Sequence, residues 1–212
     1  MTPPKKPVNL AVMLSGSGRT LLNLVDRVKQ GALDASITLV IASKECLGAE
    51  RARAAGLQTL VMPGEIAGDD LGRALSANAV DLVALAGYIR LLAIPPAYRD
   101  RILNIHPALL PSFGGSGMYG HRVHQAVLDA GCKVSGCTVH LCDDSYDRGP
   151  ILVQRACPVM ETDHAESLAA RVFELEKEAY PEALELMISG RVQIMRGRAR
   201  ILPEPAGGRG GG

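Results

Sequence analysis

The chain alternates apolar runs with amphipathic segments, and the first such unit is the clearest. Residues 9–14 are almost continuously apolar, as expected of a strand that is buried on both faces of a parallel sheet. They lead into a glycine-containing turn at 15–20. A helical pattern follows, with the apolar residues Leu21, Leu24, Val25 and Val28 on one face. The pattern predicts a strand, a loop and a helix that ends at a glycine.

Further units repeat this alternation. Strands are predicted at 37–42, 59–62, 82–86 and 102–105, and helices at 48–55 and 71–78. Residues 91–98, which contain two consecutive prolines, are expected to cross irregularly between two of these strands. Alternating strands and helices with short connections predict a doubly wound α/β fold, with a mostly parallel sheet and helices on both faces.

The second half of the chain begins with a glycine-dense segment at 113–120. It predicts a surface loop, either a lid beside a site or a plain connection. The remaining pattern predicts a short helix at 121–130, strands at 134–141 and 151–159, a long helix, and an extended segment or strand at 191–195. Asp163 and Glu166 have the spacing of a capping box at the start of the long helix, and Pro181 is expected to bend it.

No repeat or linker divides the chain. We expect one domain over residues 9–202, preceded by an N-terminal extension at 1–8. Residues 203–212 are rich in glycine and proline and predict a disordered tail.

Composition restricts the classes of partner. The 23 basic and 22 acidic residues nearly cancel, which argues against a large nucleic-acid-binding surface. Aromatic residues make up 3% with no Trp, so base-stacking platforms are not expected. No apolar run approaches the roughly 20 residues that span a bilayer, and no signal-type core precedes the first strand. We therefore expect a cytoplasmic protein without a membrane partner.

The five cysteines include three spaced by five residues, with His140 among them. A zinc site usually shows two cysteines two to four residues apart, and this chain lacks that spacing. In a strand at 134–142, Cys137 and His140 would point to opposite faces. Reduced core thiols are the favoured interpretation, and no metal is expected.

Candidate chemistry appears at the end of the 102–105 strand. Asn104 and His106 lie two residues apart in an extended segment, so both can face one pocket, and Pro107 ends the strand. Asp147 follows a later strand and can reach the same sheet edge. An amide N–H can stabilise an oxyanion, an imidazole can move a proton, and a carboxylate can set the charge of that imidazole. With no serine or cysteine placed as a nucleophile, direct attack by a substrate amine on a carbonyl is favoured.

The first glycine loop predicts either an anion site, because backbone N–H groups and the helix dipole favour negative charge there, or a tight turn without a ligand. A dinucleotide fits this loop poorly, since Leu21 stands where a third glycine would fall and the second strand ends without an acid at Ser43-Lys44. A phosphate monoester is the better ligand, with Arg19 adding a cation. A nucleotide-binding oxidoreductase therefore remains only as an alternative.

Two motifs resemble the folate-dependent formyltransferases that use 10-formyltetrahydrofolate: Asn104-Ile105-His106-Pro107-Ala108-Leu109-Leu110-Pro111 and Asp147-Arg148-Gly149-Pro150. Three more segments narrow the resemblance to the phosphoribosylglycinamide formyltransferases of purine synthesis: Ser15-Gly16-Ser17-Gly18, Ala86-Gly87-Tyr88-Ile89-Arg90-Leu91-Leu92 and Glu176-Lys177-Glu178-Ala179-Tyr180-Pro181. The likeness runs from about residue 9 to residue 195 and implies the formyltransferase fold, with a Rossmann-like N-terminal half. A 10-formyltetrahydrofolate hydrolase or another formyltransferase is the alternative within the same group.

The resemblance implies roles for particular residues. Asn104, His106 and Asp147 would be catalytic, as oxyanion donor, proton-transfer imidazole and the carboxylate that raises the pKa of that imidazole. The folate co-substrate would be held by Ile89, Arg90, Leu91, Leu92, Asn104, Cys142, Asp143, Asp144 and Asp147. The amine substrate, phosphoribosylglycinamide, would be held by Gly16, Ser17, Gly18, Arg19, Thr20 and Glu176. It also implies a monomer or homodimer that binds only small molecules, with no nucleic acid.

Several positions depart from the pattern of that family. Arg19-Thr20 stands where members often have Ser or Thr followed by Asn, Ala108 replaces a common serine, and Arg148 replaces a common glycine. The loop at 114–120 is longer than in the shorter family form. His121 and His124 are interpreted as helix-start and loop residues rather than as additional catalysts.

Overall fold

The structure, a computed structural model, describes residues 6–204. Within them, seven strands form one sheet in the order β3-β2-β1-β4-β5-β6-β7. The strands are β1 (Val8–Leu14), β2 (Ala35–Ala42), β3 (Thr59–Val61), β4 (Leu82–Leu85), β5 (Ile102–His106), β6 (Val134–Leu141) and β7 (Ile151–Pro158). The strands β1 to β5 pair in parallel, and β6 and β7 are antiparallel additions. The predicted doubly wound, mostly parallel α/β sheet is confirmed.

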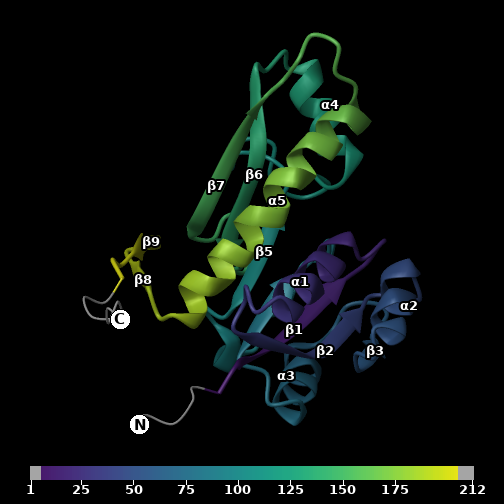
Figure 1. Cartoon of the computed structure of the whole chain (residues 1–212), viewed down its shortest axis with the longest axis vertical. Helices are drawn as coiled ribbons and strands as arrows, with labels where there is room; N and C mark the ends of the chain where they lie inside the picture. Colours follow the sequence, from purple (N-terminus) through teal and green to yellow (C-terminus); the bar gives the residue numbers. More distant parts are fainter. Residues whose placement is uncertain (1–5, 205–212) are drawn as a thin grey trace.

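Helices cover both faces of the sheet (Figure 1). They are α1 (Arg19–Lys29), α2 (Leu47–Ala54), α3 (Gly68–Ala77), α4 (His121–Asp129) and α5 (Ala165–Ile188), with a 3₁₀ turn, η1 (Pro96–Tyr98), before β5. Strand β1 shows why its sequence is apolar throughout. Leu10, Val12 and Leu14 pack into the core beneath α1, α2 and α5, whereas Ala11 and Met13 pack into the core beneath α3.

The order of the strands reverses at the centre of the sheet. The chain leaves β1 toward β2 on one side and later returns to place β4 on the other side. At such a point the loops that follow the two strands diverge, and a crevice opens beyond their carboxyl ends. The loop after β1 and the segment after β4 both line a cavity there.

The long helix α5 lies across the sheet and connects its two halves (Figure 1). It packs on β6, β7 and α4, and also contacts α1 and β5. Tyr180, at the middle of this contact, is fully buried, and its hydroxyl lies 3.0 Å from the carbonyl oxygens of both Leu85 and Leu103. Helix α5 is therefore fixed directly to β4 and β5, the strands that lead into the cavity.

The capping box predicted from Asp163 and Glu166 is wrong by one residue. His164 is the N-cap, its side chain accepts from the Ser167 N–H, and its own N–H donates to the Ser167 hydroxyl. Asp163 is unavailable for capping because its carboxylate forms two hydrogen bonds with the Arg171 guanidinium, at 2.5 and 2.8 Å. The charge-assisted pair with arginine is the stronger interaction.

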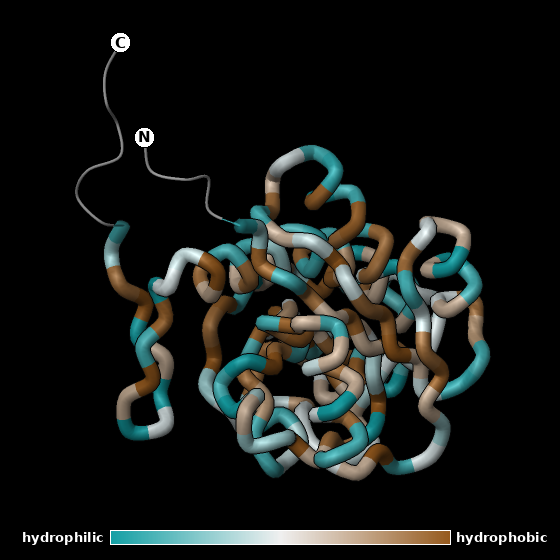
Figure 2. Tube along the Cα trace, turned by 90° about the horizontal axis from the view of Figure 1, so that it is seen from below, coloured by the Kyte–Doolittle hydropathy of each residue, from teal (hydrophilic) through white to brown (hydrophobic). Residues whose placement is uncertain are grey.

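After α5 the chain forms a two-stranded hairpin, β8 (Val192–Met195) and β9 (Arg198–Ile201). The hairpin projects at one side of the molecule (Figure 2), and its residues Val192, Ile194 and Ala199 pack against the core next to β7. The predicted segment at 191–195 is thus a strand, but its partner strand β9 was not predicted. The predicted disordered tail lies largely outside the described residues, as does most of the N-terminal extension.

Candidate active site

A cavity of about 370 Å³ lies beyond the carboxyl ends of β1, β4 and β5. Its walls come from the loop after β1 (16–20), the segment at 85–92, the end of β5 (104–107), the glycine-dense loop, the segment at 140–147, and one face of α5. The predicted catalytic, folate and acceptor residues therefore share one cavity, with one exception. Asp144 does not line it; its carboxylate is exposed and lies 3.4 Å from the Arg99 guanidinium.

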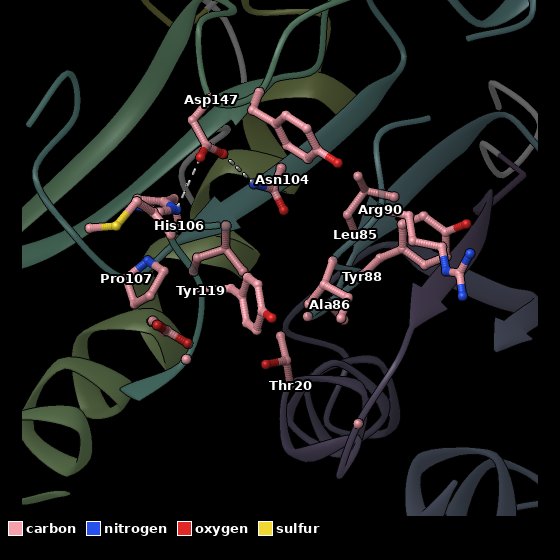
Figure 3. Close-up of a pocket in the computed structure, with 18 of the residues that line it drawn as sticks. Thr20, Leu85, Ala86, Tyr88, Arg90, Asn104, His106, Pro107, Tyr119 and Asp147 are labelled. Atoms are coloured by element: carbon pink, nitrogen blue, oxygen red, sulfur yellow. Dashed lines mark hydrogen bonds and ion pairs between the residues drawn. The ribbon is translucent and has the colours of Figure 1, made fainter. Parts of the chain in front are cut away.

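Asp147 is the centre of the polar group in this cavity, and Figure 3 shows it between His106 and Asn104. Its side chain is 9% exposed. One carboxylate oxygen accepts from the Asn104 amide at 3.3 Å, and the other accepts from the Gly115 N–H at 2.9 Å. Burial alone would raise the pKa of Asp147, but His140, His106 and the Gly115 N–H together hold that pKa below its usual value. Asp147 is a carboxylate at neutral pH.

The backbone around Asp147 is unusual. Asp147 has a positive φ of 56°, which a side chain other than glycine rarely adopts. Two residues later, a Cβ on Gly149 would lie 1.9 Å from the Leu141 carbonyl oxygen, so only glycine fits. The Asp-Arg-Gly sequence thus folds the loop tightly against β6 and turns the carboxylate toward the end of β5.

Asn104 is held from two sides. Its amide nitrogen lies 3.2 Å from Nε2 of His140 and 3.3 Å from Asp147. Nδ1 of His140 donates to the Leu141 carbonyl at 2.8 Å, so in the neutral ring Nε2 accepts the Asn104 N–H, and in the protonated ring it faces Asp147 at 3.5 Å. Both hydrogens of the Asn104 amide are therefore engaged, and the orientation of the amide is fixed.

His106 is 3% exposed and contacts the glycine-dense loop. Its Nε2 donates to the Phe113 carbonyl at 2.8 Å, so in the neutral ring Nδ1 carries the lone pair. That Nδ1 lies 3.5 Å from the Asp147 carboxylate, where a proton on it would be stabilised. Burial nevertheless lowers the pKa of His106 below its usual value, and Asp147 raises it only in part. Asp147 therefore raises the pKa of His106 as expected, and burial sets the net direction.

The glycine-dense loop begins beside His106 and Asp147. The Phe113 carbonyl accepts from His106 and the Gly115 N–H donates to Asp147, so residues 113–115 connect the two side chains. Beyond them, Met118 and Tyr119 line the cavity. The start of the loop is thus part of the site and more than a plain connection.

The first glycine loop lies across the cavity from Asp147, where Figure 3 labels Thr20. Gly18 is the N-cap of α1 with φ 75°, and the first turn contains no acidic residue and no side-chain cap. A Cβ on Gly18 would lie 2.7 Å from the Cα of Gly48 in α2, so the loop requires glycine there for both conformation and space. The first N–H groups of a helix have no acceptor within the helix, so those at the start of α1 favour negative charge at this end of the cavity.

Helix α5 adds two side chains to the same end. The Arg19 guanidinium lies 4.2 Å from the ring centre of Phe173, a cation–π contact that holds the cation beside the loop. Glu176 also lines the cavity, and burial raises the pKa of its carboxyl to about 7, although Arg19 acts in the opposite direction. This end of the cavity therefore combines backbone donors, a guanidinium and a carboxyl group that can share hydrogen bonds with hydroxyls.

The segment at 88–92 forms another wall, opposite the loop at 142–147. The Leu91 N–H donates to the Tyr146 hydroxyl at 2.8 Å, which joins these two walls. Apolar side chains of Leu85, Ala86 and Leu92 line this region beside polar groups of Asp143 and Asp147. Apolar walls with a polar edge fit a flat heteroaromatic ring.

Sequence reasoning missed several residues that line this cavity, among them His140 and Phe173, and it discounted His124. His140 carries a signal, because strand alternation places it on the face opposite the core residue Cys137. His124, interpreted as a helix-start or loop residue, lies inside α4 and is 4% exposed. Its Nδ1 has no hydrogen-bond partner among the described residues, and burial lowers its pKa to about 4.

Residues 6–204 contain neither a cluster of metal-binding side chains nor a membrane-spanning helix. No group of three or more His, Cys, Asp and Glu side chains is arranged to hold a metal ion there. Within the same range, no helix combines the length and apolar character needed to cross a membrane.

Comparison with known proteins places these observations in a family. The model of the family described as "Formyl transferase" matches residues 8–184. A phosphoribosylglycinamide formyltransferase, chloroplastic, from Vigna unguiculata is 40% identical over 192 residues, covering 86% of this chain and 62% of that protein. The trifunctional purine biosynthetic protein adenosine-3 of Drosophila melanogaster is 39% identical over 196 residues, covering 87% of this chain and 14% of that protein. The chain therefore spans less than two thirds of these curated relatives.

Among solved structures, glycinamide ribonucleotide transformylase 1 from Symbiobacterium toebii superposes with a TM-score of 0.87 and 38% sequence identity. The match covers 96% of this chain and 98% of that chain.

Proposed function

The chain belongs to the formyl transferase family, and on this basis we propose that it catalyses the reaction of the phosphoribosylglycinamide formyltransferases. In this reaction the formyl group of 10-formyltetrahydrofolate passes to the glycyl amine of phosphoribosylglycinamide, a step of de novo purine biosynthesis. The observation that carries the proposal is the group of Asn104, His106 and His140 around one buried carboxylate, Asp147, in a cavity that also contains an anion site. Similarity to the Vigna, Drosophila and Symbiobacterium proteins supports it.

We assign the folate to the wall formed by residues 88–92 and 142–147. Ile89, Arg90, Leu91, Leu92, Cys142 and Asp143 line the cavity there, together with Asn104 and Asp147. The backbone of these segments supplies hydrogen-bonding groups for the edge of the pterin, and the apolar side chains pack on its faces. Asp144 is left out of this assignment because its side chain lies outside the cavity.

We assign the phosphoribosyl end of the acceptor to the opposite wall. Gly16, Ser17, Gly18, Arg19, Thr20 and Glu176 all line the cavity. The phosphate would bind the N–H groups at the start of α1 and the guanidinium of Arg19. Glu176 would accept hydrogen bonds from the ribose hydroxyls. The glycyl amine would then point toward Asp147.

Formyl transfer requires only a few side chains of the protein. The folate supplies the formyl carbon. The amine attacks this carbon to form a tetrahedral intermediate, and the bond from the carbon to the folate nitrogen breaks when that intermediate collapses. The Asn104 amide, oriented by His140, donates to the carbonyl oxygen as negative charge develops there. Since His140 orients the amide through one hydrogen, the hydrogen that points to Asp147 is the one that this oxygen would take. The proton released by the amine passes to Nδ1 of His106, where Asp147 stabilises it, and from there to the departing folate nitrogen.

An absorbance assay of folate deformylation tests the proposal. With phosphoribosylglycinamide present, deformylation and formylated acceptor should appear together; without it, absorbance should stay constant. Equal deformylation without the acceptor would instead indicate a hydrolase. Asn104→Ala should lower kcat by about 10²–10³, the usual cost of one oxyanion donor. Gln193→Ala, an exposed change in the distant hairpin, is the control and should leave kcat unchanged.

Three further expectations stay predictions: a cytoplasmic location, a monomer or homodimer, and the absence of a nucleic-acid partner. Gel filtration coupled to light scattering would decide the second.

A further inference from the structure

A proline inside α5 leaves one backbone carbonyl without its helical partner. Pro181 has no N–H, so the Lys177 carbonyl four residues earlier cannot form the usual helix hydrogen bond. Helix α5 nevertheless continues through this position, and Pro181 is buried within it. A carbonyl freed in this way needs another donor.

Two side chains of α1 supply that donor. Asn23 Nδ2 donates to the Lys177 carbonyl at 3.1 Å, and Arg27 Nη2 donates to the same oxygen at 3.3 Å. Arg27 also pairs with the Glu178 carboxylate. Asn23 and Arg27 are four residues apart, so they lie on the same face of α1. The missing N–H of Pro181 is thus used to join two helices.

These contacts lie directly beside the anion end of the cavity. Asn23 is one turn after Arg19, and Lys177 follows Glu176. At the cavity itself, α1 and α5 meet again where the Arg19 guanidinium stacks on Phe173. On the other side of α5, the Tyr180 hydroxyl bonds to the Leu85 and Leu103 carbonyls. One turn of α5 therefore fixes the first glycine loop relative to the strands that carry the catalytic residues.

We propose that Asn23 and Arg27 are positioning residues for the acceptor substrate. By bonding to the carbonyl that Pro181 leaves free, they set the distance between the phosphate-binding N-terminus of α1 and Glu176 on α5. The class of ligand is a ribose phosphate, and this identification rests on the proposed function. Neither residue lines the cavity, so each acts only through α1.

The test separates positioning from simple stabilisation. In Asn23→Ala/Arg27→Ala, the KM for phosphoribosylglycinamide should rise about tenfold, as expected when two hydrogen bonds that hold a binding element are lost. The KM for the folate should change less than about twofold, and kcat at saturation should be retained. Arg53→Ala removes an exposed arginine of α2, which pairs with Glu45 ahead of that helix, and should leave both KM values unchanged.

Adding Pro181→Ala to the double variant sharpens the test. Alanine returns an N–H to the Lys177 carbonyl, so the thermal midpoint should recover, whereas the acceptor KM should stay high because α1 is still not attached. Recovery of the acceptor KM together with the midpoint would mean a structural role only and would overturn the proposal. A parallel rise of the KM values of both substrates would do the same.

Calorimetric titration with ribose 5-phosphate keeps this inference distinct from the proposed function. Weaker binding in the double variant than in the unmodified protein supports the positioning role, even if no formyl transfer to phosphoribosylglycinamide is found. Equal binding in both proteins overturns it, even if formyl transfer is found.

Discussion

The amide nitrogen of Asn104 lies 3.2 Å from Nε2 of His140, directly across the antiparallel pair of β5 and β6. The Leu141 carbonyl fixes the proton of His140 on Nδ1, so Nε2 is free to accept. This contact decides which way the Asn104 amide points, and therefore where its N–H is available to a substrate oxygen.

We predict from this contact that His140→Ala lowers kcat about tenfold to a hundredfold, since a misoriented donor loses transition-state stabilisation while the residue itself remains. His140→Gln can place an amide oxygen near the same point and should retain more of kcat than the alanine variant. Steady-state kinetics at saturating substrates make the comparison. Equal kcat in His140→Ala and the unmodified protein would mean that the contact does not orient Asn104.

The contrast between β1 and the Asn104–His140 pair shows what the sequence alone could give. The apolar run of β1 predicts a strand buried on both faces, and in the structure Leu10 to Leu14 are at most 1% exposed. This prediction needs only local information, because the hydropathy of each residue indicates whether that residue is buried. The pairing of Asn104 with His140 depends on the register between two strands 36 residues apart, which no local pattern specifies.

The helix start at His164 fails for a related reason. Asp163 is a residue type that is preferred at the N-cap. Its carboxylate instead accepts hydrogen bonds from Arg171, two turns into α5. His124 was underestimated because helical spacing cannot tell a core histidine from one that borders a cavity. Local propensity predicted the elements, and tertiary contacts decided which polar side chains were available.

Asp147→Asn is expected to lower kcat by about 10²–10³, because the neutral amide cannot stabilise a proton on Nδ1 of His106. The pH profile adds a second readout. Burial already holds the pKa of His106 below its usual value, so kcat/KM should fall only below about pH 6.5. Without the Asp147 charge this pKa falls further, and the acid limb of kcat/KM should move to lower pH.

Asp144→Asn changes an exposed carboxylate outside the cavity and is the matched control. It should change neither kcat nor the position of the acid limb. An unchanged acid limb in Asp147→Asn would show that His106 does not govern the profile.

Glu176 should make the stability of the protein depend on pH. Its pKa is raised to about 7 in the folded state, above the value of 4.5 for an unperturbed Glu. Between these values the folded protein binds more protons than the unfolded chain, so the free energy of unfolding should decrease as pH rises from 4.5 to 7. Urea unfolding across this range measures the effect, and Glu176→Gln should remove this part of the slope.

Glu185→Gln, an exposed change on the same helix, is the control for Glu176 and should leave the slope as it is. The same slope in Glu176→Gln and the unmodified protein would mean that Glu176 is ionised throughout. Its role toward ribose hydroxyls would then be that of a permanent acceptor.

Gly18→Ala should damage both stability and acceptor binding, whereas Gly16→Ala in the same loop should affect stability little. At Gly18 an added Cβ would lie 2.7 Å from the Gly48 Cα, and φ is 75°, which costs an L side chain about 1–2 kcal/mol before the clash is counted. At Gly16 an added Cβ meets nothing within 4 Å, so the expected change is within about 0.5 kcal/mol. Thermal unfolding should show a lower midpoint for Gly18→Ala by at least about 2–4 °C for a chain of this size.

Because the strain must be relieved by moving the start of α1 away from α2, the KM for phosphoribosylglycinamide should rise in Gly18→Ala while the KM for the folate does not. Equal midpoints in the two variants would mean that the first turn of α1 can shift freely, and that it is not the rigid anion site that the acceptor requires.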